Sequence, residues 1–258
     1  MANLEEILKS YSPKLHIFER ALLREYLQYK ILNIIFSEAK WASMLCFLGG
    51  TCLRIVHNNL RFSEDLDFDN FGLSEKEFVE ISQLIKTKLE EEGYELEIRN
   101  VTKGAFRCYI RFPKLLYSLG LSGYVEEKIL IQLDSQSQKF DFRPQSFLLQ
   151  KLDVFTEIFV TPPDLLLAQK FYAILNRKRS KGRDFFDVVF LLSKTNPNFD
   201  FLKKKAGIAT SAELKNRILE FCKNISLKDM AEDVRPFLIQ KTNVSQVELF
   251  DKFIAQTL

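Results

Sequence analysis

Two aspartates separated by one residue are the side chains of this sequence best suited to bind a metal ion. Asp65 and Asp67 lie within residues 61–68, where polar and apolar residues alternate. If this segment is a strand, both carboxylates lie on one face. Their repulsion across roughly 6–7 Å becomes attraction when a divalent cation binds beside them. A lone pair of this kind more often consists of solvated surface acids, so the neighbouring features have to decide.

A glycine turn lies a short distance upstream of these acids. Residues 44–48 are apolar and predict a short buried strand, which Gly49, Gly50 and Thr51 follow before a helix. Backbone N–H groups at a helix start can bind phosphate oxygens, and glycines let the backbone approach them closely. Alone, such a turn is more often only a tight turn with a helix cap. Strand, glycine turn, helix and acidic strand in this order are typical of a polymerase-type nucleotidyltransferase core.

Two blocks of the sequence carry a more specific resemblance. The first comprises residues 47–53 and 61–68; the second runs from residues 163–175 through Arg177 to residues 182–187. In this order and spacing they closely resemble the AbiEii-like nucleotidyltransferase toxins. These proteins are the toxins of bacterial abortive-infection and type IV toxin–antitoxin systems. The resemblance extends over about residues 44 to 193.

The resemblance implies an activity and a set of site residues. It implies transfer of a nucleoside monophosphate from an NTP to an acceptor, with one or more magnesium ions, two being typical of such chemistry. The metal ligands implied are Asp65 and Asp67. The implied catalytic residues are Asp65, Asp67, Lys170 and Asp184, and the implied nucleotide-binding residues are Gly49, Gly50, Thr51, Ser63, Lys170 and Arg183. Arg177 lies on the same helix face as Lys170, seven residues on, and could continue the contact with phosphate.

A third carboxylate is expected from a neighbouring strand, as a metal ligand or as a base. Asp134 ends an alternating segment, residues 128–134, on its polar face. Family members often carry an acid at the position of Leu130, so this chain departs from the pattern there. Asp134 is therefore the candidate, both catalytic and metal-binding, and Asp141 is a weaker substitute.

Charged residues of the second block allow more than one interpretation. Lys170 lies among apolar residues, where an ammonium needs an anion such as a nucleotide phosphate, although a lysine at a helix edge can also extend to solvent. Arg183 and Asp187 are spaced for a plain ion pair as well as for catalysis. The basic residues 177–183 form either a solvated loop or a guide for RNA phosphates. Glu64 falls on the apolar face of its strand, so we expect it buried with a partner such as Arg54.

The periodicity predicts an α+β fold with a small mixed sheet and a helical C-terminal region. Proline punctuation at residues 161–163 separates an expected core, residues 1–160, from a helical domain, residues 161–258, that completes the active site. Expected strands cover residues 44–48, 62–69, 94–98, 105–112 and 128–134. Expected helices cover residues 16–42, 51–59, 164–177, 183–193, 211–222 and 244–255. Ser74 and Glu77 predict the start of a further helix, and residues 114–125 form a loop or partial helix.

Composition restricts the other possibilities. A net charge of +3 does not by itself indicate nucleic-acid binding, and the four cysteines and two histidines lack the spacing of a zinc site. We expect reduced, buried cysteines. The sequence shows neither an N-terminal signal pattern nor an apolar stretch long enough for a membrane span, so a cytoplasmic protein is expected.

The resemblance also suggests partners. It implies an RNA acceptor, with tRNA ends as the closest precedent, and a cognate antitoxin protein. Two alternatives stay open at the level of sequence: a nucleotide-binding module that has lost catalysis, and a nucleotidyltransferase that modifies small molecules such as antibiotics.

Overall fold

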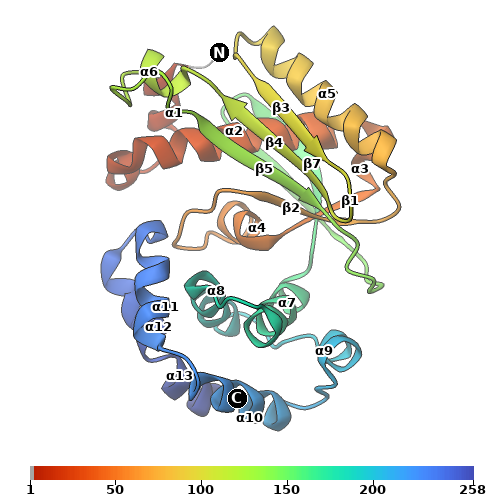
Figure 1. Cartoon of the computed structure of the whole chain (residues 1–258), viewed down its shortest axis with the longest axis vertical. Helices are drawn as coiled ribbons and strands as arrows, with labels where there is room; N and C mark the ends of the chain where they lie inside the picture. The colour runs from red at the N-terminus through yellow and green to blue at the C-terminus, as the bar shows by residue number, and fades with distance from the viewer. Residues whose placement is uncertain (1–2) are drawn as a thin grey trace. The chain divides into compact units, whose positions relative to one another are not determined.

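The computed structural model describes residues 3–258, which form two compact units. The first contains residues 3–52 and 63–160, and the second contains residues 53–62 and 161–258. Figure 1 labels the elements of both units. Each unit is described by itself below.

The first unit is built on a seven-stranded sheet with the order β3-β4-β5-β2-β1-β7-β6. The strands are β1 (Leu45–Leu48), β2 (Leu66–Asn70), β3 (Glu97–Val101), β4 (Phe106–Phe112), β5 (Ile129–Ser135), β6 (Gln145–Lys151) and β7 (Val154–Val160). Strand β2 pairs in parallel with β5, and β1 pairs in parallel with β7, whereas the other pairs are antiparallel. The predicted mixed α and β fold is confirmed, with a larger sheet than the sequence indicated.

Helices α2 (Glu19–Phe36) and α5 (Glu75–Glu91) pack on this sheet and on each other. Helix α2 contacts β5, β6 and β7, and α5 contacts β3 and β4. The alternating strands β4 and β5 bury one face, as predicted, and leave the other for polar side chains. The buried residues of these two strands are Cys108, Ile110, Phe112, Ile129, Ile131, Leu133 and Ser135.

The smaller elements of the first unit lie at its margins. They are α1 (Leu4–Lys9), the 3-10 turn η1 (Pro13–Phe18), α3 (Ala39–Ala42) and α6 (Leu115–Ser118), while α4 (Gly49–Ile55) begins here and ends in the second unit. The turn between β6 and β7 is held by ion pairs to Lys30, whose own side chain is buried. Lys30 Nζ lies 2.7 Å from Asp153 Oδ2 and 2.7 Å from Glu92 Oε1, and Tyr26 also donates to Asp153.

The second unit is helical, apart from one short pairing between chain segments. Its elements are α7 (Pro163–Asn176), α8 (Gly182–Leu192), α9 (Phe199–Ala206), α10 (Ser211–Cys222), α11 (Leu227–Val234), the turns η2 (Arg235–Phe237) and η3 (Lys241–Val244), α12 (Ser245–Glu248) and α13 (Phe250–Thr257). The segment of residues 53–62 joins them through a bridge between Arg61 and Leu238. The amide of Phe62 donates to the carbonyl of Phe237 at 2.8 Å.

Several local expectations are corrected. Helix α4 begins at Gly49 rather than Thr51, and β2 begins at Leu66 rather than at residue 62. Strand β3 begins at Glu97 rather than at residue 94, and Tyr94 and Leu96 are buried ahead of it. The single helix expected over residues 244–255 is divided at Leu249 into α12 and α13. Strands β6 and β7 were not predicted at all.

Other expectations are confirmed. Ser74 and Glu77 form the expected capping box at the start of α5. All four cysteines are buried thiols outside disulfide bonds, and burial raises the pKa of the Cys108 thiol to about 12. Within residues 3–258, none of the helices combines the length and the apolar character that a membrane crossing requires.

Candidate functional site

The register of three strands brings Asp67 and Asp134 together. Strand β2 lies between β1 and β5, and Asp67 is opposite Leu48 on one side and Asp134 on the other. Residues directly opposite in a parallel pair point to the same face. The two carboxylates therefore occupy neighbouring positions on the sheet face that β4 and β5 leave for polar side chains. Asp65 precedes β2 by one residue, in an extended segment without ladder pairing of its own.

Gly49 makes close contact with the Asp67 carboxylate possible. Its φ of 81° lies in the left-handed region, and a Cβ atom placed on it would lie 2.1 Å from Asp67 Oδ2. Any side chain at this position would therefore both strain the backbone and displace the aspartate. The glycine turn and the acidic strand act as one local structure.

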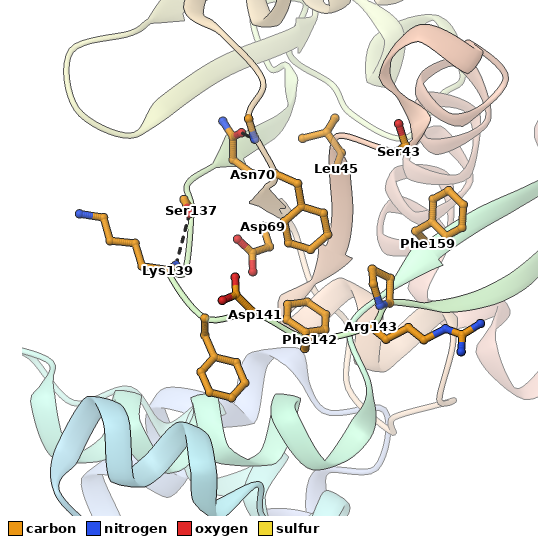
Figure 2. Close-up of a pocket in the computed structure, with 14 residues that line it drawn as sticks. Ser43, Leu45, Asp69, Asn70, Ser137, Lys139, Asp141, Phe142, Arg143 and Phe159 are labelled. Carbon is orange, nitrogen blue, oxygen red and sulfur yellow. Dashed lines mark hydrogen bonds between the residues drawn. The ribbon is translucent and has the colours of Figure 1, made fainter.

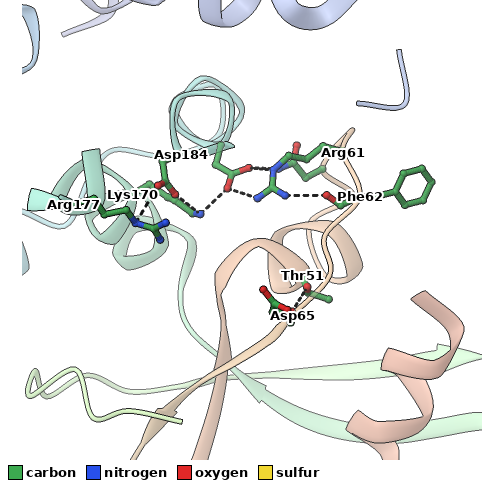
Figure 3. A network of polar contacts seen from close by, with 9 residues as sticks. Thr51, Arg61, Phe62, Asp65, Lys170, Arg177 and Asp184 are labelled. Carbon is green, nitrogen blue, oxygen red and sulfur yellow. Dashed lines mark hydrogen bonds and ion pairs between the residues drawn. The ribbon is translucent and has the colours of Figure 1, made fainter. Parts of the chain in front are cut away.

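Thr51 fixes the start of the acidic strand. Its buried hydroxyl donates a short hydrogen bond to the carbonyl oxygen of Asp65 (Figure 3). The backbone carbonyl of Asp65 is thus held by a side chain, directly before β2 begins at Leu66. The hydroxyl that the sequence suggested for a phosphate contact has this structural role.

The surroundings of Asp134 are polar but incompletely paired. Gln132 Nε2 donates to Asp134 Oδ2 at 2.7 Å, and Arg107 Nε lies 3.4 Å from Oδ1. Oδ1 is buried and accepts no hydrogen bond from a described residue. Burial raises the pKa of the Asp134 carboxyl, and the contacts with Gln132 and Arg107 oppose this shift only in part. Both carboxylate oxygens thus face polar groups, Oδ2 the amide of Gln132 and Oδ1 the guanidinium of Arg107.

These residues fit a magnesium ion in part. Asp67 and Asp134 supply hard oxygen ligands on one face, although Oδ1 of Asp134 is buried beside Arg107. In residues 3–258, no group of three or more His, Cys, Asp or Glu side chains is arranged to hold a metal. Magnesium commonly takes only one or two carboxylates from a protein and completes its shell with substrate phosphates and water. Asp67 and Asp134 would supply such a pair of carboxylates, and substrate and water would complete the shell.

Ser63 and Glu64, which precede Asp65, are held by side chains of α2. Gln28 Nε2 donates to the carbonyls of Ser63 at 3.1 Å and Glu64 at 2.9 Å. The Glu64 carboxylate is not buried as expected: its side chain is 40% exposed and pairs with Arg24 at 2.7 Å. The expectation failed because Glu64 lies before β2, where strand alternation does not apply. Arg54, its expected partner, instead lies over the ring of Phe62.

A second cluster of charges lies within the second unit and centres on Asp187; Figure 3 labels Arg61, Lys170, Arg177 and Asp184 in it. The guanidinium of Arg61 donates to its two oxygens at 2.7 and 2.6 Å, and Asn59 Nδ2 donates to Oδ1 at 2.8 Å. Both Arg61 and Asp187 are buried. Burial would raise the pKa of the Asp187 carboxyl, but the charges of Arg61 and Lys170 outweigh it and lower this pKa to about 2.

Lys170 joins this cluster from α7. Its ammonium lies 2.9 Å from Asp184 Oδ1 and 2.7 Å from Asp187 Oδ2. Burial alone would lower the pKa of Lys170, yet the two carboxylates raise it, so the ammonium stays charged. Arg177 Nε lies 3.4 Å from Asp184 Oδ2 at the edge of the cluster, with its side chain about half exposed. The sequence anticipated an anion for Lys170 but did not identify Asp187 or Arg61 as members.

Arg183 lies apart from this cluster. Its guanidinium is over the ring of Phe237, 4.9 Å from the ring centroid. The alternative ion pair with Asp187 is therefore not formed, since Asp187 pairs with Arg61 and Lys170 instead. The start of α8 is fixed by Gly182, whose amide donates to Asp233 Oδ2 at 2.8 Å and whose Cα lies against the Met230 carbonyl.

Comparisons with known proteins agree with this architecture. Two crystal structures from Helicobacter pylori have the same fold, each with 17% sequence identity and a TM-score of 0.57. The first is JHP933, and the match covers 92% of this chain and 92% of JHP933. The second is described only provisionally as a nucleotidyltransferase, and the match covers 92% of this chain and 95% of that one. Among curated proteins, none matches this chain.

The family assignment follows from the sequence profile that matches residues 30–253, which is described as nucleotidyl transferase AbiEii toxin of a type IV toxin–antitoxin system. This match includes the glycine turn, the acidic strand, Lys170 and the helix that carries Asp184 and Asp187. The chain is a nucleotidyltransferase and belongs to the AbiEii toxin family.

Proposed function

We propose that this enzyme moves a nucleoside monophosphate from an NTP to an RNA acceptor, such as a tRNA end, in a magnesium-dependent reaction. The observation that carries the proposal is the register of Asp67 with Asp134, with Gly49 against the Asp67 carboxylate. Phosphoryl transfer depends mainly on positioning and on charge stabilisation. A fixed pair of carboxylates on one sheet face can position a metal ion, and that ion can stabilise the charge of the phosphates.

Asp65 and Asp67 are the proposed metal ligands, and Asp134 is the proposed third carboxylate. Bound magnesium, in two ions by analogy with related chemistry, would neutralise the triphosphate and favour the leaving pyrophosphate. Gly49, Gly50, Thr51 and Ser63 are proposed to hold the triphosphate. Of these, Thr51 acts through Asp65, because its hydroxyl already donates to the Asp65 carbonyl.

For the second unit, we propose that Lys170 and Asp184 are catalytic and that Arg177 and Arg183 contact nucleotide. Support comes from the family and from the unusual state of Lys170, a buried ammonium between two carboxylates. The guanidinium of Arg177 contacts Asp184, and that of Arg183 lies over the ring of Phe237. Long cationic side chains held at one point can reorient toward a phosphate.

The acceptor and the partner are proposed from the family. A type IV toxin–antitoxin family suggests a cognate antitoxin, and the basic residues 177–183 suit phosphate contacts with RNA. Lys178 and Arg179 within this segment are exposed. Their charges are therefore available to an acceptor strand.

The test measures incorporation of each of four labelled NTPs into total RNA, together with pyrophosphate release. Wild type should label RNA, whereas Asp67→Asn and Asp65→Asn should lose transfer by at least about 100-fold, because each removes one charge from the metal site. Asp200→Asn, an exposed aspartate in α9, is the matched control and should be as active as wild type.

Equal melting temperatures would show that the aspartate variants stay folded. Transfer retained by both Asp65→Asn and Asp67→Asn would sink the proposal. Nucleotide binding without pyrophosphate release would indicate an inactive module, and labelling of aminoglycosides instead of RNA would contradict the proposed acceptor.

A further inference from the structure

A cavity of about 720 Å³ lies within the first unit, at the carboxyl end of β2. Its wall combines residues that end or precede strands β1, β2 and β7 with the segment of residues 136–144 that follows β5 (Figure 2). A volume of this size is within the range of small-molecule and cofactor sites. No role has been assigned so far to the residues that line it, except that Asp141 was the weaker candidate for a third carboxylate.

The cavity wall is attached to the strand that carries Asp67. The amide of Gln136 donates to the carbonyl of Phe68 at 3.1 Å, and the amide of Gln138 donates to Asp69 Oδ1 at 2.8 Å. Residues 136–144 are thereby fixed along the end of β2. The cavity is a built feature of this unit.

Two carboxylates face each other across the cavity. Figure 2 shows the side chains of Asp69, which is 1% exposed, and Asp141, which is exposed, pointing toward one another. Carboxylates that face each other repel, and the repulsion is strongest where one is buried. A ligand group that donates one hydrogen bond to each carboxylate relieves this repulsion. An amino group has two such hydrogens.

The rest of the wall is aromatic. Phe71 and Phe142 pack edge to face with their ring centroids 5.5 Å apart, and Phe140 and Phe159 also line the cavity. All four rings keep part of their surface exposed. Flat aromatic surfaces of this kind stack on nucleobases, whatever the base.

The position of the cavity relates it to the proposed site. Asp69 follows Asp67 by two residues on β2, so both point to the same sheet face at a spacing of about 7 Å. Lys139 and Arg143 also line the cavity, and both are exposed. Cations at the edge of an aromatic cavity suit the phosphates of a nucleotide whose base lies inside.

We propose that this cavity binds a nucleobase that carries an exocyclic amino group, stacked on the phenylalanines and donating that amino group to Asp69 and Asp141. The inference rests on the proposed function in that it takes the ligand to be a nucleotide of that reaction. Adenine, cytosine and guanine carry the amino group, and uracil does not. The base belongs either to the incoming NTP or to the terminal nucleoside of the acceptor.

The test is isothermal titration of the purified full chain with AMP, CMP, GMP and UMP, without magnesium. These ligands share the phosphate, so differences between them report on the base. We expect AMP, CMP or GMP to bind about tenfold more tightly than UMP, as hydrogen bonds to charged groups allow. Equal affinity for all four in wild type would overturn the proposal.

Two variants locate the effect in the cavity. Phe142→Ala should weaken the amino-bearing nucleotides about tenfold through lost stacking. Asp141→Asn, an exposed change that leaves the fold intact, should reduce the preference over UMP. Phe155→Ala, which removes a 65% exposed ring on β7 outside the cavity, is the matched control and should bind as wild type does. Unchanged binding in both cavity variants would contradict the assignment.

Steady-state kinetics then identify the source of the base. If Phe142→Ala raises the KM for NTP, the cavity takes the NTP base; if it raises the KM for RNA, it takes the acceptor end, and either result supports the proposal. No change in either KM would overturn it. Binding of monophosphates does not require transfer, so failure here leaves the tests on Asp65 and Asp67 standing, and failure of those tests leaves the binding result interpretable.

Discussion

Arg61 donates hydrogen bonds to both carboxylate oxygens of Asp187, a residue 126 positions later in the sequence. The pair is buried, and its carboxylate also contacts Lys170 and Asn59. Two cations and two carboxylates, those of Arg61, Lys170, Asp184 and Asp187, thus form a neutral group inside the second unit. Such a group is stable only while every member has its partner.

Removing Arg61 alone should therefore be costly. We expect Arg61→Met to lower the free energy of unfolding by about 3 kcal/mol, because Asp187 loses its main counter-charge in a buried position. Chemical denaturation measures this value. The control is Arg235→Ala, which breaks an exposed ion pair with Glu232 in the same unit and should cost far less stability than Arg61→Met.

Removing the pair as a whole should be milder. In Arg61→Met combined with Asp187→Leu, Lys170 keeps Asp184 as its partner, and no buried charge is left alone. We expect this double variant to be more stable than Arg61→Met. An equal or greater loss of stability would show that the ion pair is not the unit of stabilisation.

Acid should weaken the second unit in a defined range. The pKa of Asp187 falls from an ordinary value of 3.8 to about 2 in the folded state. A carboxyl with a depressed pKa stabilises the fold above its unfolded pKa, and this stabilisation is lost as the pH falls through the folded pKa. Between pH 4 and pH 2, wild type should lose about 2 kcal/mol more than the double variant without Asp187. Parallel curves for the two proteins would contradict the assignment.

Gly49→Ala should damage transfer more than stability. The added Cβ would meet Asp67 Oδ2, so the carboxylate must move, and a displacement of about 1 Å can lower activity about 100-fold. Gly120→Ala is the control: Gly120 also has positive φ, but nothing lies within 4 Å of the added Cβ. Both variants should lose about 1 kcal/mol from backbone strain. Only Gly49→Ala should lose NTP transfer, and equal activity of the two would count against a role for the Asp67 position.

Chelation should stop transfer without unfolding the protein. With EDTA, we expect labelling of RNA to fall to background and to return when magnesium is added in excess. Magnesium should also raise the melting temperature of wild type in the presence of NTP, because a ligand that binds only the folded state stabilises it. Asp67→Asn should show no such rise. Full transfer in EDTA would exclude a metal requirement.

The local parts of the fold follow from local sequence. The capping box of Ser74 and Glu77, the buried faces of β4 and β5 and the strand before Gly49 depend on residues close in sequence, and all were predicted. Strands β6 and β7 were missed because Leu148 and Phe155, 54% and 65% exposed, place apolar side chains on the solvent side. Their pattern does not alternate, so it gave no strand signal.

The candidate site divides in the same way. Asp65, Asp67 and Asp134 were each proposed as candidates from the sequence, but the register that sets Asp67 beside Asp134 depends on strand pairing that a sequence pattern does not specify. Asp187 was considered only as a partner for Arg183, because helical spacing suggests neighbours and not a residue from a distant segment. The cavity beyond Asp69 needs three separate strands to form, and no local pattern predicts it.

Residues 53–62 belong to the second unit although they precede most of the first. On a ribosome, Arg61 and Asn59 emerge long before Asp187 is synthesised, so this ion pair forms late and closes a long loop. A fragment of residues 161–258 expressed by itself would contain Asp187 but not Arg61, whose guanidinium pairs with it. Domain dissection of this protein therefore requires a circular permutant or a fused 53–62 peptide, and a simple cut near residue 160 would yield a helical fragment with a defective core.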